Sequence, residues 1–143
     1  MPLDWIHENP PRWDADKARI IDGARAGTLD LKKLGERRPG ALLPGEWWRA
    51  ADGGRAVGYG WMDTTWGDAE ILLAVEPDGQ GRGTGSFILD HLEQEAHARG
   101  LNQLYNVIPA AHPEPEKLAR WLGKRGFAPA GDGRLLRAVL KAG

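Results

Sequence analysis

The chain has 143 residues and a mass of 15.7 kDa, so we expect residues 1–143 to form a single domain. Hydrophobic residues make up 41% and charged residues 27% of the chain, which is typical of a folded protein and excludes the composition of a disordered one. The net charge of -1 leaves no strong positive field that would favour nucleic acid or an anionic membrane as a partner.

The N-terminal stretch and the lack of cysteine bear on location and chemistry. Residues 1–13 have neither the charged start nor the apolar core of a signal peptide, and no run approaches the ~18 apolar residues of a membrane span. We therefore expect a cytoplasmic protein. The chain contains no cysteine, which excludes disulfides, zinc sites built on thiolates and a cysteine nucleophile.

The first 75 residues predict short helical segments followed by an antiparallel sheet. Residues 3–6 favour a short strand, and Asp14 is a suitable N-cap for a helix that continues towards Gly27. Residues 29–40 predict one or two further helical turns. Residues 46–75 contain three strand-like runs, of which the last is almost continuously apolar and therefore belongs in the centre of a sheet.

The second half of the chain alternates helices and strands. Residues 84–99 carry apolar side chains at helical spacing, and residues 102–108 favour a strand. Because a helix separates this strand from the central one, we expect the two to be parallel, although they need not touch along their whole length. Residues 114–127 contain a second amphipathic helix that we expect to end at Gly126, and residues 134–140 predict a closing strand.

A glycine-rich segment lies between the central strand and the helix that follows it. Residues 79–86 read GQGRGTGS, with a glycine at every second position. Such a turn exposes backbone N–H groups at the positive end of a helix dipole, and without Cβ atoms the backbone can approach a diphosphate closely. The alternative is a tight turn without a ligand, which four glycines make entropically costly. The segment therefore predicts an anion site, to which Arg82 adds a charge.

The spacing of these glycines distinguishes among known phosphate-binding loops. The dinucleotide pattern G-x-G-x-x-G fails in every frame, and the P-loop pattern requires a lysine that this segment lacks. The pattern that remains is Q-x-x-G-x-G at Gln80, Gly83 and Gly85, after an apolar strand and before an amphipathic helix.

In this setting, residues 70–127 resemble a GNAT-type N-acetyltransferase, since the pattern QGRGTG is followed at the expected distance by the Gly126–Phe127 pair. The resemblance implies an α/β GNAT fold, with a mixed central sheet of about six or seven strands flanked by about four helices. It implies a transfer of the acetyl group of acetyl-CoA, the co-substrate, to a primary amine of a small molecule or peptide by direct attack. The resemblance is compatible with a homodimer and implies no metal ion.

The resemblance also assigns residues to the coenzyme A site. In such enzymes the loop amides bind the diphosphate, and the end of the neighbouring strand pairs with the pantetheine arm and polarises the thioester carbonyl. Carried over to this chain, the positions are Val75, Gln80, Gly81, Arg82, Gly83, Thr84, Gly85 and Ser86.

The chain departs from the family pattern at two places. Leu122 stands where a tyrosine often protonates the leaving thiolate, and Pro115 lies in the region of an asparagine that commonly contacts the cofactor. A thiolate can also leave unassisted into water. The only tyrosines, Tyr59 and Tyr105, are alternative acids that more commonly pack in strands.

A general base would help because a substrate ammonium must lose a proton before its nitrogen can attack. Glu70 matches the position of the glutamate that serves as base in several family members. A carboxylate at the start of a strand that faces solvent or pairs with an arginine is an equally good interpretation of it. Glu76 and His112 are further candidates, for which a loop role and simple exposure are respectively favoured.

Four tryptophans, at positions 47, 48, 61 and 66, could form an aromatic wall for the acceptor, although core packing explains at least half of them. The sequence does not identify the acceptor. A non-catalytic acyl-CoA-binding or regulatory module on the same fold, which kept the loop and lost the acid, is the alternative function.

Overall fold

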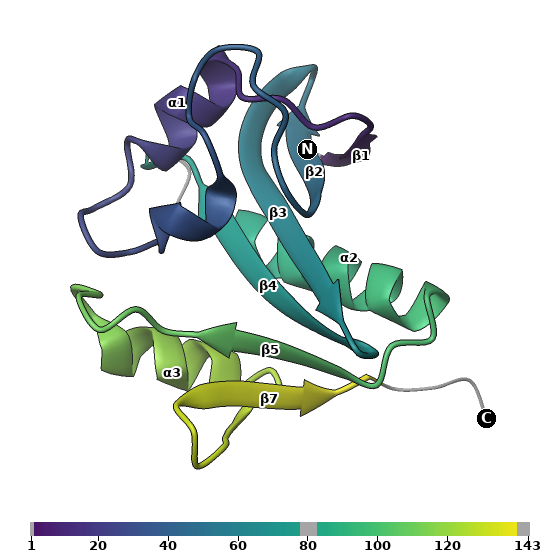
Figure 1. Ribbon diagram of the computed structural model, residues 1–143, viewed down its shortest axis with the longest axis vertical. Coiled ribbons are helices and arrows are strands. Elements are labelled where there is room, and N and C mark those ends of the chain that lie inside the picture. Colours follow the sequence, from purple (N-terminus) through teal and green to yellow (C-terminus); the bar gives the residue numbers. More distant parts are fainter. Residues whose placement is uncertain (1, 78–82, 140–143) are drawn as a thin grey trace.

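The computed structural model describes residues 2–77 and 83–139, in which seven strands form one mixed sheet with the order β1-β2-β3-β4-β5-β7-β6 (Figure 1). The strands are β1 (Asp4–Glu8), β2 (Glu46–Asp52), β3 (Arg55–Thr65), β4 (Asp68–Val75), β5 (Gln103–Val107), β6 (Ala128–Pro129) and β7 (Arg134–Ala138). The described helices are α1 (Ala15–Ile21), η1 (Leu31–Leu34, a 3-10 turn), α2 (Thr84–Ala98) and α3 (Pro115–Gly123).

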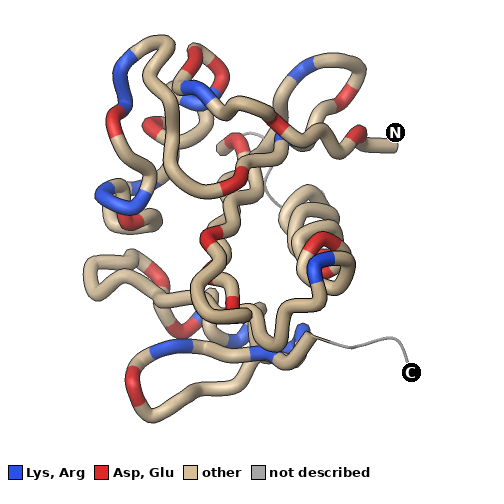
Figure 2. The backbone as a smooth tube through the Cα atoms, turned by 45° about the vertical axis from the view of Figure 1, so that its right-hand side comes forward, with Lys and Arg blue, Asp and Glu red and all other residues tan. Residues whose placement is uncertain are grey.

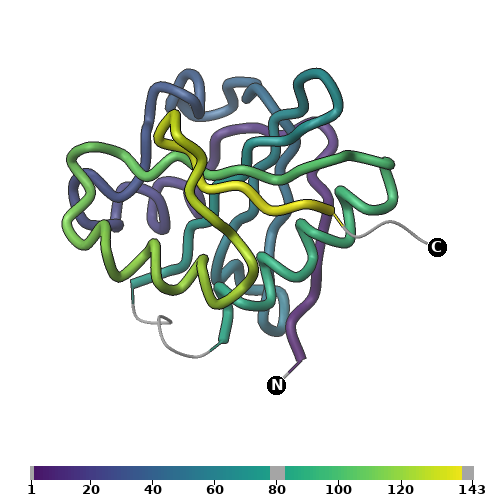
Figure 3. Tube along the Cα trace, turned by 90° about the horizontal axis from the view of Figure 1, so that it is seen from below, coloured from purple at the N-terminus to yellow at the C-terminus, as the bar shows by residue number. Residues whose placement is uncertain are grey.

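Helices cover both faces of the sheet. Apolar side chains of α2 and α3 pack on one face, and those of α1 and η1 pack on the other, so that two hydrophobic clusters share the sheet between them. Figure 3 shows α2 and α3 on the same side of the strands. The strand number agrees with the predicted six or seven, while the described residues hold three α-helices and one 3-10 turn where about four helices were expected.

Helix α1 begins as the sequence predicts and ends earlier. Asp14 is its N-cap, and the carboxylate accepts a hydrogen bond of 2.9 Å from the backbone N–H of Lys17. The helix ends at Ile21 rather than near Gly27, because the chain turns at Asp22 and Gly23. Residues 22–30 therefore form a loop beside the sheet instead of two further helical turns.

Glycines in β3 allow α2 to lie close to the sheet. A Cβ atom at Gly58 would lie 2.8 Å from the Ile88 side chain and 2.8 Å from the Ala74 carbonyl oxygen, and one at Gly60 would lie 3.0 Å from Ile88. These positions leave no room for a methyl group. The helix N-terminus is thereby held against the middle of β3 and β4.

Charges of both signs are interspersed along the described chain, in keeping with the balanced composition (Figure 2). No helix within residues 2–77 and 83–139 is long and apolar enough to cross a membrane.

Strands β4 and β5 are parallel, as predicted, and pair over only three positions. The last of these pairs joins Glu70 to Tyr105. One residue further along, the side chain of Asn106 donates a hydrogen bond of 2.9 Å from Nδ2 to the carbonyl oxygen of Ile71. This side-chain bond replaces the next backbone contact, and beyond it the two strands diverge.

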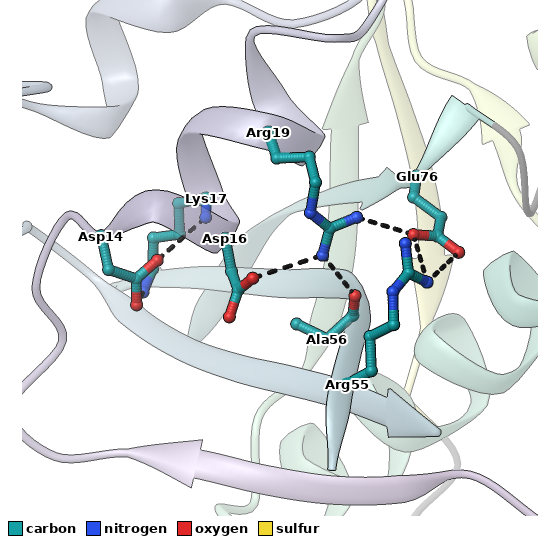
Figure 4. Close-up of polar contacts among 7 residues, drawn as sticks. All are labelled: Asp14, Asp16, Lys17, Arg19, Arg55, Ala56 and Glu76. Atoms are coloured by element: carbon teal, nitrogen blue, oxygen red, sulfur yellow. Dashed lines mark hydrogen bonds and ion pairs between the residues drawn. The ribbon is translucent and has the colours of Figure 1, made fainter. Parts of the chain in front are cut away.

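The carboxylate of Glu76, just after β4, holds three segments together (Figure 4). It lies 2.7 Å from Nη1 of Arg19 on α1 and 2.8 Å from Nη1 of Arg55 on β3. Arg19 also donates a hydrogen bond of 2.7 Å to the carbonyl oxygen of Ala56. The hydrogen bonds from Arg55 and Arg19 lower the pKa of Glu76 below its ordinary value of 4.5.

We expect Glu76→Gln to lower the free energy of unfolding by about 1–3 kcal/mol at pH 7, because it removes the charged partner of two arginines. A carboxyl whose pKa is lowered by folding stabilises the protein above the ordinary pKa, and this contribution is lost as the pH falls through the lowered value. The difference between variant and wild type should therefore narrow below pH 4.5. Urea denaturation at several pH values measures it.

Glu36→Gln is the matched control, because Glu36 pairs with Arg38 through side chains that are both more than two-thirds exposed. It should change stability by less than about 1 kcal/mol at every pH. Equal losses in the two variants would show that Glu76 has no special role in the fold.

Candidate active site

A cleft of about 590 Å³ lies where β4 and β5 diverge. Its walls come from the second half of β4, the start of α2, the end of β5 and one side of α3, and the loops 22–30 and 108–114 close its far end. The cleft is thus a direct consequence of the short pairing between the two central strands.

The N-terminus of α2 forms one end of this cleft. Gly83 is the N-cap, with a φ of +83°, and no side chain of the described residues caps the helix. Within residues 2–77 and 83–139, the first amides of this 15-residue helix therefore have no capping side chain, and they lie at the positive end of its dipole. Gly85 and Ser86 also line the cleft, so this end is suited to an anion.

The structure brings together most of the described residues predicted for the coenzyme A site. Val75, Gly83, Gly85 and Ser86 line the cleft, whereas Thr84 is buried beside them and is not part of its lining. The three remaining predicted positions, Gln80, Gly81 and Arg82, lie outside the described residues.

The edge of β4 that faces the cleft is open to pairing. Backbone pairing with β5 stops at Glu70, so the segment from Leu72 to Val75 has no β5 residue opposite it. Its backbone groups on this edge can pair with an extended ligand as a sheet pairs with an added strand.

Asn106 is a cleft residue that the sequence analysis missed. Only 7% of it is exposed, and its Nδ2 atom must face the Ile71 carbonyl, because that carbonyl can only accept a hydrogen bond. Its Oδ1 atom is buried and has no hydrogen-bond partner among the described residues. A buried acceptor without a partner is costly, which marks the point of divergence as a place where a donor group would be stabilised.

Glu70 lies at the last β4–β5 pair, on the same face of β4 as Leu72 and Ala74, since side chains alternate along a strand. It is 8% exposed and forms an ion pair with Nζ of Lys33 on η1. Glu70 does not line the cleft itself. Leu72, two residues further along the same face and roughly 7 Å away along the strand, does line it. Glu70 is therefore paired with a lysine, where the sequence suggested an arginine or solvent, and its role as a base stays a prediction.

The other candidate acids and bases differ in their surroundings. Glu76 is bound by two arginines and forms no part of the cleft. The hydroxyl of Tyr59 is buried without a partner in the described chain, and burial raises its pKa. Leu122 is buried and lines the cleft, so the place of the usual tyrosine is apolar. His112 also lines the cleft, and its Nδ1 atom accepts a hydrogen bond of 2.9 Å from the backbone N–H of Glu114.

The tryptophans do not form one exposed wall. Trp47, Trp48 and Trp61 are at most 3% exposed, whereas Trp66 is 96% exposed in the β3–β4 turn. The indole N–H groups of Trp47 and Trp61 both donate to the Pro44 carbonyl oxygen at 3.1 Å. With Tyr59, these two rings line a cavity of about 10 Å³, room for about one water molecule. Core packing thus accounts for three of the four.

Two loops meet at the far end of the cleft. A Cβ atom at Gly27, where φ is +85°, would lie 2.0 Å from the carbonyl oxygen of Ala111. Nη1 of Arg25 lies 3.4 Å from Oε2 of Glu114. The two loops therefore touch backbone to backbone, and only glycine fits at this contact.

We expect Gly27→Ala to lower stability by more than the cost of the left-handed backbone alone. Gly40 has nearly the same φ, +81°, with no atom within 4 Å of an added Cβ, so Gly40→Ala isolates that cost at about 1–2 kcal/mol. Gly27→Ala should lose more stability than this, because the added methyl group must also displace the backbone of Ala111. Chemical denaturation compares the two variants, and equal losses would contradict the contact between the loops.

Among the described residues, no group of three histidine, aspartate or glutamate side chains is placed to hold a metal ion.

Comparisons with known proteins agree with this architecture. A family model described as an acetyltransferase (GNAT) domain matches residues 44–129. A stretch of 63 residues is 36% identical to an amino-acid acetyltransferase of Pseudomonas putida (strain GB-1), which corresponds to 44% of this chain and to only 13% of that protein.

Two solved structures illustrate the likeness in fold. The ribosomal-protein-S18-alanine N-acetyltransferase of Escherichia coli has a TM-score of 0.66 at 19% identity, over 99% of this chain and 97% of that one. A phosphinothricin acetyltransferase of Sinorhizobium meliloti, in complex with AcCoA, has a TM-score of 0.63 at 21% identity, over 97% and 89%. The chain therefore belongs to the GNAT acetyltransferase family, and the predicted GNAT fold is confirmed.

Proposed function

We propose that the protein transfers the acetyl group of acetyl-CoA to the nitrogen of a primary amine, by direct attack of that amine. The observation that carries the proposal is the cleft along the unpaired edge of β4, which joins an uncapped helix N-terminus to the region of Glu70. The family supports an acetyltransferase, and the Sinorhizobium meliloti enzyme with AcCoA bound supports the choice of donor.

The described residues fit such a donor at its phosphate end. The uncapped amides of α2 suit a diphosphate, and Gly85 presents bare backbone to the cleft beside Trp121. Lys117 also lines the cleft and adds a positive charge to this wall. We assign the same role to Gln80, Gly81 and Arg82 from the sequence pattern alone.

The open edge of β4 fits the extended arm of the donor. Between Leu72 and Val75 it offers backbone donors and acceptors that β5 does not use. A backbone amide near Val75 would polarise the carbonyl of the thioester, which acetyl-CoA supplies as the activated form of the acetyl group. We infer that Asn106 holds this geometry by fixing the point at which the strands separate.

Glu70 is the base in this proposal. Its Oε2 atom contacts Lys33, and its Oε1 atom makes no hydrogen bond to the residues described, so this oxygen can take a proton from the ammonium directly or through a water. The amine nitrogen then bonds to the acetyl carbon and passes its second proton to water, the bond between carbon and sulfur breaks, and the electron pair of that bond leaves with the thiolate. Because Leu122 is apolar, we expect water to protonate the thiolate.

A thiol-release assay with panels of amines tests the function and Glu70 together. We expect amine-dependent release of coenzyme A, and a decrease of about 100-fold in kcat/KM for Glu70→Gln near neutral pH. The activity of this variant should recover as the pH approaches the pKa of the amine, near ~10.4 for a lysine-like acceptor, because the free amine needs no base. Glu36→Gln should retain full activity.

A Glu70→Gln variant with unchanged rates at all pH values would remove the base assignment alone. The second candidate function is a non-catalytic acyl-CoA-binding module, which the apolar side chain at Leu122 favours. Calorimetry with coenzyme A measures the binding that both candidate functions require. Binding without thiol release from any amine would establish that function, and a lack of binding would contradict both.

Gly85→Ala separates binding from stability. The added Cβ would lie 3.6 Å from Trp121, an ordinary contact, and alanine favours a helix, so we expect stability to rise by up to about 1 kcal/mol. The methyl group would stand in the cleft wall and keep a diphosphate from the amides, which should weaken coenzyme A binding by about tenfold or more.

Gly123→Ala is the matched control, because Gly123 lies in α3 with no atom within 4 Å of an added Cβ. It should leave the affinity for coenzyme A unchanged. If Gly85→Ala bound coenzyme A as tightly as this control does, the phosphates would not lie on the N-terminus of α2.

A further inference from the structure

The ion pair between Lys33 and Glu70 is placed where the acceptor must arrive. Glu70 lies at the last β4–β5 pair, next to the point of divergence, and on the face of the sheet opposite α2 and α3. The loop that carries Thr28 and Leu29 lines the cleft and leads directly into η1, which holds Lys33. An acceptor that reaches Glu70 therefore also meets Lys33.

Each member of this pair has the other as its one ion partner in the described part of the chain. The side chain of Lys33 is 27% exposed and thus partly open, whereas that of Glu70 is 10% exposed and largely buried. The single ion partner, and not the exposure, distinguishes Glu70 from Glu76, whose two oxygens are held by two arginines. The Lys33–Glu70 contact can thus be exchanged for contacts to a ligand without breaking a larger network.

Further polar groups surround the pair. Tyr105 is the β5 partner of Glu70, and the guanidinium of Arg134 lies 5.1 Å from its ring centre. Burial, together with the nearby charges of Glu70 and Asp63, raises the pKa of Tyr105, so its hydroxyl keeps its proton and can donate a hydrogen bond. The site beside Glu70 therefore presents charges of both signs and a neutral donor.

This arrangement discriminates among amines. An ammonium that binds the free Oε1 atom of Glu70 competes with Lys33 for the single negative charge of this carboxylate, and a partly buried positive charge without a full counter-charge is destabilising. An acceptor that carries a carboxylate next to its amine provides Lys33 with a new partner and leaves no charge unpaired. Because Lys33 and Glu70 are in direct contact, the carboxylate and the ammonium of the acceptor that pair with them must also be close together.

We propose that the acceptor is a small zwitterion of the α-amino acid type, whose ammonium binds Glu70 and whose carboxylate binds Lys33. Polycations and simple amines would bring an additional positive charge beside Lys33 with no counter-charge for it. The inference rests on the proposed acetyl transfer and narrows its acceptor to one chemical class. Lys33 is then a specificity residue, and its charge affects acceptors with a carboxylate more than acceptors without one.

The test compares amino acids with their amides, which keep the side chain and the amine and lose the negative charge. Alanine, leucine, phenylalanine and glutamate are each assayed beside the corresponding amide by thiol release. We expect kcat/KM of the best amino acid to exceed that of its amide by about 10- to 100-fold, the range for a hydrogen bond to a charged group. The amine of an amino amide is less basic than that of the amino acid, so more of it is unprotonated at neutral pH. A preference set only by the amount of free amine would therefore favour the amides.

Lys33→Met should reduce this preference to within about threefold, and Lys33→Arg should restore most of it, because guanidinium also binds carboxylate. Lys32→Met is the matched control, since Lys32 is its exposed neighbour on η1, and it should leave the preference unchanged. The readout is the ratio of kcat/KM for an amino acid to kcat/KM for its amide, so a general loss of activity in Lys33→Met does not affect it.

The failures are distinguishable. If neither amino acids, amides nor simple amines release thiol, the proposed function is wrong and this inference falls with it. If amides or simple amines are acetylated as well as amino acids, or if Lys33→Met keeps the full preference, acetyl transfer stands and the zwitterionic acceptor is overturned.

Discussion

The candidate site depends on the short pairing between β4 and β5. Three parallel pairs join the strands and end at Glu70 and Tyr105, after which the Asn106 side chain takes the Ile71 carbonyl that a continuing ladder would use. A longer ladder would close the cleft and occupy the edge of β4. The loss of a few backbone hydrogen bonds within the sheet thus creates a binding edge in the interior of the protein, where an incoming chain-like ligand can restore them.

Alternation along β4 then assigns different tasks to its two faces. Side chains directed to one face pack under α2 and so fix the N-terminus of that helix, while Glu70, Leu72 and Ala74 share the other face with α1 and η1. A donor held by α2 and an acceptor bound near Lys33 would therefore approach the same few residues of β4 from opposite directions. Such an arrangement suits a direct transfer, because neither substrate has to pass the other.

Local signals in the sequence were sufficient for most of the fold and for one end of the site. Capping, periodicity and glycine spacing predicted the start of α1, the helix after the glycine segment and its bare N-terminus, since these depend on neighbouring residues. The sequence did not indicate Lys33 and Asn106, because each acts through a contact with a β4 residue that is distant in the chain. Lys33 is 37 residues from its partner and Asn106 is 35 residues from its partner. The four tryptophans do not form the wall that the sequence allowed, and core packing, expected for at least half of them, accounts for three. The sequence set no closer limit because a ring that fills the core and one that lines a pocket have similar neighbours in the chain.

Glu70 and Glu76 show why burial and charge alone do not identify a functional carboxylate. Both are 8% exposed, both lie on or next to β4, and both contact cations. Two planar guanidinium groups fix both oxygens of Glu76 from two different elements, which suits a permanent joint. Glu70 has a single ammonium on a flexible stem and one oxygen free of bonds to the described chain. A carboxylate that must exchange its partner for a substrate and receive a proton needs this second arrangement, and it is found on the side of the strand where the acceptor would enter.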